Sequence, residues 1–505
     1  MGFLSLSFAG FVLVAIVTYY GIGLVAPRSQ WAVLLIVSLL FYAFMADGYF
    51  FVPLLITACA TWAGALAIER FPSRKRLVLF ATLALCFIQL GYFKYWNTIL
   101  YYLRVTPDHT GLGILLPLGI SFYTFQSLGY LLDVYGGEIS AEKNLARHLL
   151  FVTWFPQIIQ GPINAYENTG AALFANRSFD VHAVFKGFLR FGYGVFKKYA
   201  IANTLLATEN ALFSNVGAET PGSIALYGVF IYSIQMYADF SGGIDMVEGI
   251  SELFGIEMAQ NFKQPYFSTS LSEFWQRWHM SLGAWMKKYV FYPLALAKPL
   301  QEIGRSAKKR FGRHMGRTIP PSIANVIVFF LVGLWHGAES HYLAWGIYNG
   351  VVIALSDLCT PLFKKLKAPL GTAMKTLPYR IFACVRTFLV VAVGRFFDRC
   401  VSVGAALLCL RNIFTNFMPM PFADALAGYG VDLSAPCGFP FIAMLACAIV
   451  FAISLAYELG VDVREWLIGL NPIALAAILS IFALFVAFSF WYIPSEGGGF
   501  IYANF

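Results

Sequence analysis

Charged residues are scarce in this chain of 505 residues: Asp, Glu, Lys and Arg make up 12% of it, whereas 59% is hydrophobic. A soluble domain carries about 25% charged residues. Apolar windows such as FAGFVLVAIVTYYGIGLVA and ANVIVFFLVGLW approach the ~20 residues that span a bilayer, and they recur along the whole chain. The first window lacks a basic start and a small-residue cleavage site, which favours a spanning helix over a signal peptide. The composition excludes a soluble protein and predicts an all-α polytopic membrane protein.

Paired cysteines and metal-binding spacings are also lacking. The eight cysteines stand singly and form no CxxC pair, which is typical of small buried hydrophobes rather than of disulfides or metal ligands. No histidine pair has the HExxH spacing, so metal catalysis is unsupported and no metal is expected. The net charge of +9 arises from clusters in loops. Such clusters indicate membrane orientation, and no nucleic-acid partner is expected.

Lys and Arg gather in three clusters, at 70–76, 298–317 and 364–386. Loops rich in these residues stay on the cytoplasmic side, so all three are predicted to face the cytoplasm. Three crossings precede the first cluster and three follow the last, which predicts that both chain ends lie outside. About ten to twelve membrane segments are expected, some of them partial. The clearest crossings are expected near 4–26, 31–47, 49–68, 387–409, 436–458 and 471–493.

Two apolar segments are interrupted by helix-breaking residues. LLPLGISFYTFQSLGYLLDVYGG, at 115–137, contains a proline and a glycine near its start and carries Gln126 and Asp133. FVTWFPQIIQGPI, at 151–163, has prolines on both sides of QIIQG. Broken helices at membrane depth need protein or water to satisfy their backbone groups, so both segments are predicted to line a cavity. Ordinary proline kinks are the alternative.

A third segment, YSIQMYADFSGGIDMVEGIS at 232–251, places Asp239, Ser241 and Asp245 in apolar surroundings. Ionisable groups are costly in a membrane and usually face a polar interior. The glycine pair between the two aspartates predicts a turn. A structural polar network is the favoured role for these residues.

The stretch FWQRWHMSLGAWMKKYVFYP, at 274–293, concentrates polar and aromatic side chains in an oily chain. Trp and Tyr favour the membrane interface, where Lys and Arg extend toward water. The stretch precedes the strongest basic cluster, so we expect it at the cytoplasmic rim. It is either an anchoring helix at the interface or the mouth of a site for a polar or anionic cofactor that enters from the cytoplasm.

One histidine closes an apolar run: His336 lies in LVGLWHGAES, at 331–340. Histidine is rare in membrane helices and is well suited to proton transfer near neutral pH. A histidine satisfied by a backbone carbonyl is the alternative. The other histidines outside the aromatic stretch lie in less apolar or loop-like surroundings; they are His109, His148, His182, His314 and His341.

These motifs together resemble the membrane-bound O-acyltransferases (MBOAT), in the bacterial branch that acts on exported polymers. That branch includes alginate and peptidoglycan O-acetyltransferases and the D-alanyl transfer protein of teichoic acid modification. The matching stretches run in family order over nearly the whole chain: LGYFKYWN, LPLGISFYTFQSLGYLLDVY, FPQIIQGPI, YADFSGGIDM, FWQRWHMSLGAWMKKYVFYPL, GLWHG and FIYANF. One departure is the pair Lys287 and Lys288, where the family often shows Arg-Asp.

The resemblance implies a single membrane domain over 1–505 whose membrane helices, some broken or re-entrant, surround a central funnel or tunnel. Its parts would be N-terminal helices at 1–110, a catalytic core at 111–360, C-terminal helices at 361–493 and an external tail at 494–505. Within it, His336 matches the family histidine that acts as the general base, and His279 matches a second, less constant one. Residues implied to line the donor's path are Trp275, Arg277, Trp278 and Trp335.

The implied reaction moves an acyl group, with acetyl favoured, from a cytoplasmic thioester toward hydroxyls of an extracytoplasmic polysaccharide or cell-wall polymer. The donor would be acetyl-CoA or an acyl group on a carrier protein, and no tightly bound cofactor is expected. The implied partners are the lipid bilayer of the cytoplasmic membrane, the polymer, and an extracytoplasmic transferase that resembles an esterase. Transfer of D-alanine to teichoic acid is an alternative. A small-solute transporter is another, although no internal repeat is evident.

The chain ends in PSEGGGFIYANF, where three glycines precede a short aromatic tail. The tail is too short to span a membrane or form a stable helix, so we expect it to dock into the protein above His336. Tyr502 is its only side-chain hydroxyl after the glycines. Tyrosine can form covalent intermediates near a base, which predicts that Tyr502 carries the acyl group. Simple packing of an apolar tail is the alternative.

Overall fold

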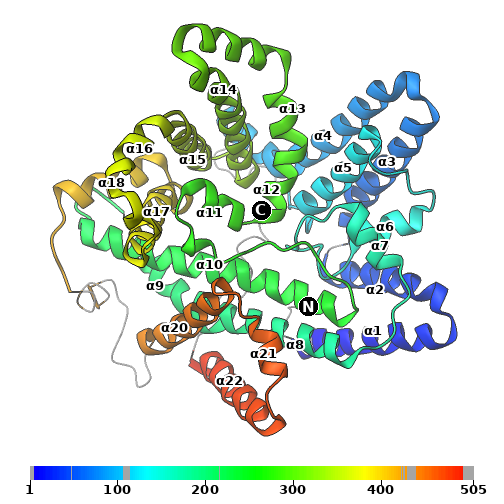
Figure 1. The fold of residues 1–505 in the computed structure, drawn as a ribbon. Coiled ribbons are helices and arrows are strands. Elements are labelled where there is room, and N and C mark those ends of the chain that lie inside the picture. Colours follow the sequence, from blue (N-terminus) through cyan, green and yellow to red (C-terminus); the bar gives the residue numbers. More distant parts are fainter. Residues whose placement is uncertain are drawn as a thin grey trace. The chain divides into compact units, whose positions relative to one another are not determined.

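The computed structural model describes residues 5–46, 48–105, 114–214, 216–421, 424, 427–428 and 439–492. Within these residues the secondary structure is helical and no β-strand occurs (Figure 1), so the all-α prediction is confirmed. The chain forms two compact units that are interleaved in sequence. Among the described residues, unit 1 lies within 5–195 and 243–260, and unit 2 lies within 196–242 and 261–492.

Unit 1 contains the N-terminal helices. Their bounds are α1 Leu6–Val25, α2 Gln30–Met45, α3 Phe51–Arg70, α4 Lys75–Tyr102, α5 Ile120–Gly136, α6 Leu145–Thr153, α7 Tyr166–Phe174 and α8 Val181–Phe196. Short 3-10 turns at Pro27–Ser29, Gly48–Phe50 and Pro72–Arg74 join the first four helices. The first three crossings were predicted near these positions, because each is one apolar run bounded by a short connection.

Aromatic rings fill the core of unit 1. The rings of Phe41 and Phe155 lie 5.5 Å apart. Phe254, which directly follows α10 (Gly222–Leu253) in the returning segment 243–260, lies 5.8 Å from Phe155 and 5.7 Å from Trp154. Such edge-on contacts add to the free energy gained by burial. The returning segment is therefore an integral part of this unit's core.

The two interrupted segments, 115–137 and 151–163, lack regular helix near the prolines and glycines that interrupt them, as predicted. Helix α5 begins only at Ile120, after Gly119 adopts a left-handed φ of 71°. Residues 154–165 form no helix, yet most of them are buried. Side chains of other helices hydrogen-bond to backbone groups here. The N–H of Phe155 donates to Ser38 Oγ at 3.2 Å, and Gln126 Nε2 donates to the carbonyl of Phe151, just before the segment, at 2.5 Å.

Unit 2 contains the remaining elements. They are η4 Lys197–Asn203, α9 Thr204–Phe213, α10 Gly222–Leu253, η5 Pro265–Phe267, α11 Leu271–Arg277, α12 Met280–Met286, η6 Lys287–Phe291, α13 Tyr292–Ala295, α14 Lys298–His336, α15 Ser340–Leu358, α16 Thr360–Lys367, η7 Ala368–Lys375, α17 Leu377–Arg399, α18 Val403–Thr415, α20 Phe439–Glu458, α21 Val463–Ile468 and α22 Pro472–Tyr492. The last part of α10 belongs to unit 1.

Three local predictions for these elements are wrong. The crossing expected over 387–409 is divided, because α17 ends at Arg399 and Ser402 caps α18 by accepting the N–H of Ala405 at 3.1 Å. The basic cluster at 298–317 is part of α14, kinked at Gly312 (φ 88°), and is not a loop. No turn separates Asp239 from Asp245, because α10 continues through the glycine pair.

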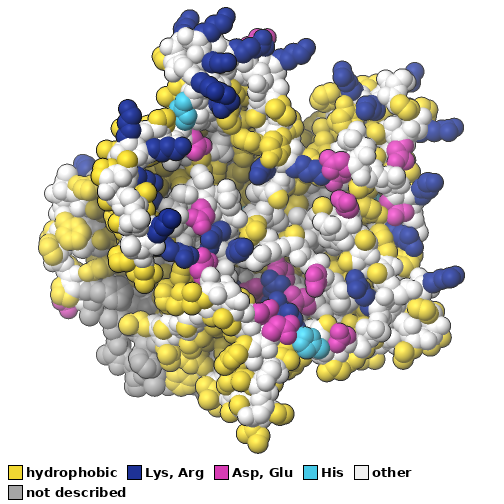
Figure 2. Space-filling model, viewed as in Figure 1, with side chains coloured by type: hydrophobic (Ala, Val, Ile, Leu, Met, Phe, Trp, Pro, Cys, Tyr) yellow, Lys and Arg dark blue, Asp and Glu magenta, His cyan; other side chains and the backbone are white. Residues whose placement is uncertain are grey.

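Six helices among the described residues are long and apolar enough to cross a membrane, or seven if the bent pair α15 and α16–η7 counts as one span. The count of ten to twelve segments stays a prediction. Apolar side chains cover much of the surface drawn in Figure 2, while Lys and Arg gather around the start of α14. Apolar surface beside a basic segment is typical of a membrane protein.

Candidate active site

His336 is the last residue of α14 and is buried. Its position follows from close packing of α14 on α15: a Cβ on Gly333 would lie 2.5 Å from the carbonyl oxygen of Tyr342, and one on Gly346 would collide with the carbonyl of Phe329. Glycines at a helix interface allow the two backbones to approach. As a result the imidazole of His336 lies 5.0 Å from the ring of Trp345.

His279 lies where the aromatic stretch breaks between α11 and α12. It adopts a left-handed conformation, with φ 49° and ψ 52°, and caps the start of α12. This conformation is unfavourable for a residue with a Cβ and persists only when the surroundings impose it. The N–H of the next residue, Met280, donates to the carbonyl of Asn261 at 2.9 Å, so a neighbouring segment holds the break in place.

Asn261 also orients the ring of His279. Its Oδ1 accepts the backbone N–H of Ser281 at 3.1 Å and the Ser281 hydroxyl at 2.9 Å. Because a backbone N–H can only donate, this side-chain atom is the oxygen. The same oxygen lies 3.1 Å from His279 Nδ1, which must therefore carry a proton. In the neutral ring the lone pair is then on Nε2.

The two histidines belong to one aromatic cluster in unit 2. The ring of His279 lies 4.9 Å from Phe240 and 6.0 Å from Trp335, and Trp335 lies 4.9 Å from His336. The cluster continues from His336 to Trp345 and from there to Trp275, whose ring centroid is 5.5 Å away. The structure thus brings together most of the residues singled out at 274–293 and in GLWHG.

Trp278 contacts a residue that the sequence did not single out. The buried guanidinium of Arg395, in α17, lies 4.5 Å from the centre of the Trp278 ring and donates to Asp398 Oδ2 at 3.0 Å. The hydroxyl of Tyr232 donates to the same oxygen at 3.0 Å. The sequence could have indicated this network, because Arg395 and Asp398 are ionisable residues inside an apolar run, and such residues indicate a functional or structural network.

Arg277 is engaged with carboxylates in unit 2. It donates to Glu458 Oε2 at 2.8 Å and lies 2.7 Å from Glu273 Oε1. Burial raises the pKa of Glu273, but hydrogen bonds from Thr269 and the Arg277 charge outweigh this and lower it below its usual value. Glu458 also accepts from Arg380 at 2.6 Å. The arrangement ties α11 to α17 and α20, and the predicted place of Arg277 on the donor's path is untested.

The acidic residues of α10 pair with cations that were also missed. In unit 2, Asp239 forms an ion pair with Lys198, and Ser241 Oγ accepts from Lys197 Nζ at 2.8 Å. Both lysines are buried in the π-helix η4. Their signal was the KK pair inside the apolar run VFKKYAIANTLL. π-Helical turns are rare and often mark functional sites.

In unit 1, Asp245 Oδ1 lies 3.2 Å from Nε of Arg190. The two other nitrogens of the Arg190 guanidinium form ion pairs with Glu248 and Glu252. Gln126 and Asp133 are buried in α5 of the same unit. The structural network favoured for Asp239, Ser241 and Asp245 therefore consists of separate clusters in the two units.

Other buried histidines have partners typical of structural residues. His341 Nδ1 lies 3.0 Å from the carbonyl oxygen of Phe397, and His148 Nε2 lies 3.1 Å from Thr61 Oγ1. His314 Nε2 lies 3.1 Å from the carbonyl of Leu358. Tyr502 and the tail at 494–505 lie outside the described residues, as does His109.

Residues 138–303 match the family described as MBOAT, membrane-bound O-acyltransferase family. A probable alginate O-acetylase of Pseudomonas syringae is 32% identical over 377 residues, 73% of this chain and 66% of that protein. One from Azotobacter vinelandii is 31% identical over 416 residues, 80% and 77% of the two chains. A peptidoglycan O-acetyltransferase of Helicobacter pylori is 29% identical over 416 residues, 75% and 73%. The matched region spans just under two thirds of the first relative.

Proposed function

Because the chain belongs to the membrane-bound O-acyltransferase family, we propose that it transfers an acyl group, acetyl in the simplest case, from a cytoplasmic thioester to hydroxyls of an extracytoplasmic polysaccharide. The observation that carries this proposal is the joint burial of His336 and His279 in one aromatic cluster. The relatives' names support acetyl as the group and an exported polymer as the acceptor.

His336 serves as the general base in this proposal. It takes the proton of the attacking hydroxyl while the oxygen bonds to the acyl carbon and the carbon–sulfur bond breaks. The proton then passes to the departing thiolate, so that a free thiol is released. A thioester is activated enough for positioning and one base to carry the step, and a general base contributes about 10²–10⁴-fold.

His279 acts beside it as a hydrogen-bond acceptor or second base through Nε2. The fixed proton on Nδ1 supports this role, because it keeps the lone pair on Nε2. Trp275, Trp278 and Trp335 border the same cluster. They would enclose the acyl thioester in a funnel and exclude the water that would hydrolyse it.

Tyr502 is proposed to relay the acyl group. The sequence argument is the flexible glycine run before a short aromatic tail with a single hydroxyl. The tyrosine oxygen would attack the thioester, His336 would take its proton, and the resulting tyrosyl ester would pass its acyl group to a polymer hydroxyl through an extracytoplasmic transferase. Tyr502→Phe keeps the ring and removes the oxygen, so it should abolish polymer acylation at normal protein levels. Full acylation by this variant would refute the relay.

The relay requires both chain ends outside the cytoplasmic membrane and the basic start of α14 inside, as the positive clusters predict. Single cysteines near Phe505 and near Lys308, labelled with an impermeant maleimide from each side, test this orientation in the otherwise cysteine-free protein. Labelling near Phe505 from the cytoplasm alone would exclude the relay while leaving the transferase chemistry open.

The donor is tested directly. Membranes that contain the chain are incubated with acetyl-CoA labelled in the acetyl group, or with an acyl carrier protein charged with labelled acetate or D-alanine, and label in the protein and the polymer is counted. We expect transfer of acetyl, with none from His336→Ala membranes. Transfer of D-alanine alone would replace acetyl as the group, and the absence of transfer from any of these thioesters would overturn the proposed function.

A further inference from the structure

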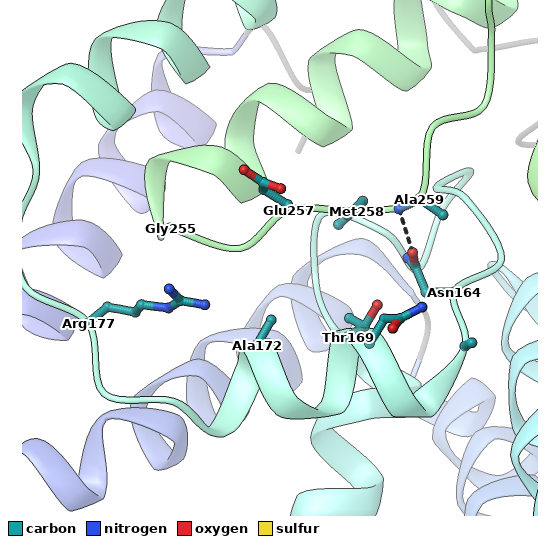
Figure 3. A pocket seen from close by; sticks show the side chains of 10 residues that line it. Asn164, Thr169, Ala172, Arg177, Gly255, Glu257, Met258 and Ala259 are labelled. Atoms are coloured by element: carbon teal, nitrogen blue, oxygen red, sulfur yellow. Dashed lines mark hydrogen bonds between the residues drawn. The ribbon is translucent and has the colours of Figure 1, made fainter. Parts of the chain in front are cut away.

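A cavity of about 550 Å³ opens in unit 1 (Figure 3), and none of its lining residues belongs to the aromatic cluster. Its walls are the segment around Asn164, helix α7, the residues before α8, and the strand-like run 255–259 that follows α10. All of these segments belong to unit 1. The proposed acyl transfer gives this cavity no role.

The walls are joined by a buried amide. Asn164 donates to Gln157 Oε1 at 3.0 Å and accepts the backbone N–H of Ala259 at 2.8 Å. Asn164 is itself 4% exposed. This side chain connects the run 255–259 to the segment before α7, so these two walls of the cavity are joined by hydrogen bonds.

Arg177 is also built into the wall by its backbone. The amide of Gln30 donates to the Arg177 carbonyl at 2.8 Å and accepts its N–H at 2.8 Å. The aliphatic part of Arg177 passes over Gly255, which has a left-handed φ of 70°; a Cβ on that glycine would lie 3.6 Å from Arg177 Cγ. Arg177 is exposed, so its guanidinium is accessible at the cavity while its backbone is fixed at the start of α2.

Two opposite charges line this cavity: the guanidinium of Arg177 and the carboxylate of Glu257. Figure 3 shows them approaching it from different segments. Among the described residues, neither side chain forms an ion pair or a hydrogen bond, with the other or with any third residue. A guest that carries both charges can satisfy both groups. A purely anionic guest would face Glu257, and a cationic guest would face Arg177.

The cavity lies beside the ends of two helices that are long and apolar enough to cross a membrane. Gln30, which holds Arg177, is the first residue of α2, and the preceding span α1 ends at Val25. Leu24, Val25 and Val181 near these ends are 89%, 85% and 70% exposed. The basic cluster at 70–76 lies at the same end of these helices as the start of α2, because α2 and α3 are successive crossings joined by a short turn. The positive-inside rule predicts that this end faces the cytoplasm.

We infer that this cavity binds a zwitterionic phosphate ester that bears an ammonium group, supplied by the bilayer as the headgroup of phosphatidylethanolamine. The phosphate lies against Arg177, whose guanidinium can donate two parallel hydrogen bonds to it. The ammonium donates to Glu257, and the polar surface near Asn168 and Thr169 completes the contact. No covalent step is involved.

The test uses the full-length protein in nanodiscs with equal amounts of phosphatidylethanolamine and phosphatidylglycerol, followed by detergent extraction and native mass spectrometry of the retained lipid. The wild type should retain phosphatidylethanolamine preferentially. Glu257→Gln should weaken retention of that lipid about tenfold, as expected for one charge-assisted hydrogen bond. Arg177→Gln should weaken retention of both lipids at least as much, because it removes the partner of the phosphate that both carry. Arg177→Lys and Glu257→Asp keep the charges and should keep most of the preference.

Arg28→Gln is the matched control, because Arg28 is an exposed cation in the turn between α1 and α2 and does not line the cavity. It should behave as the wild type. Equal retention by all variants, or a wild-type preference for phosphatidylglycerol, would overturn the inference. Displacement of the retained lipid by soluble glycerophosphoethanolamine at equal concentration would support the ligand chemistry and overturn the bilayer as its source. Acyl transfer does not enter these readouts, so failure here is separate from failure of the proposed function.

Discussion

His148 and His279 are both buried histidines among aromatic rings, but their backbones differ. His148 lies inside helix α6, with its ring 4.5 Å from Tyr130 and its Nε2 against the Thr61 hydroxyl. His279 lies at a chain break with a left-handed φ of 49°, and its ring is oriented by an amide that Ser281 itself orients. The Thr61 hydroxyl donates to the carbonyl of Thr57 at 2.8 Å, so it accepts from His148 Nε2. Both surroundings therefore fix a ring proton, on Nε2 of His148 and on Nδ1 of His279, and the two sites differ in the backbone conformation that carries the ring.

The difference teaches how to separate a structural histidine from a reactive one in an oily protein. Burial and aromatic neighbours are common to both sites and carry no distinction. Unfavourable backbone geometry that the surroundings impose is concentrated at functional sites. His336 shares a related feature, because a close backbone approach of two helices places its ring.

The largest expected effect comes from removing the base. His336→Ala should lower acyl transfer per folded molecule about 10²–10⁴-fold, because it removes the base that takes the hydroxyl proton. The measurement is transfer of labelled acetyl in membranes with matched protein levels. Near wild-type transfer would assign His336 to the same structural class as His148.

A smaller effect should follow when the helices that place His336 are separated. Gly346→Ala introduces a Cβ that collides with the Phe329 carbonyl, so α15 must shift with Trp345. A displacement of about 1 Å at a reacting group can cost about 10²-fold. Gly91→Ala, in α4 with open space around it, is the control and should leave the rate unchanged. Equal rates for both variants would show that the close approach has no catalytic value.

Asn261→Ala tests whether the tautomer of His279 matters. We expect a loss of about tenfold to a hundredfold, the range seen when partners that orient metal-binding histidines are removed. Asn261→Asp retains an oxygen that accepts from Ser281 and His279, so it should retain more activity than the alanine variant. If both variants lose activity equally while they remain folded, Asn261 acts through packing and not through the proton on Nδ1.

The smallest effect on transfer is expected at His148. His148→Leu removes the contact with Thr61 and should lower the free energy of unfolding by about 1 kcal/mol, with the rate per folded molecule unchanged. Thermal unfolding in detergent and a transfer assay normalised to folded protein measure the two quantities. A drop in rate comparable to that of Asn261→Ala would erase the distinction between the two histidines.

Much of this architecture was predictable where one sequence run makes one element. The crossings expected at 4–26 and 49–68 agree closely with α1 and α3, because long apolar runs between short connections leave few alternatives. The division after Arg399 was missed because apolar composition continues across it. Ser402 was the available signal, since serine favours the start of a helix.

The candidate site was predictable to the extent that its chemistry is local. His336 and His279 stand out by residue type and surroundings. The partners that define their environment were not predictable, because Asn261, Arg395 and Lys198 act on residues brought near by folding. A buried cation can be recognised in a sequence, but the ring or carboxylate that accepts it cannot be chosen without the fold.

The carboxylate of Glu458 limits where this chain can be shortened. The segment that identifies the family ends at residue 303, yet Arg277 within it is paired with Glu458, which also holds Arg380. A shortened chain that ended before α20 would leave both arginines without this partner. Shortened versions of the chain should therefore end beyond Glu458, after α20, and not at residue 303.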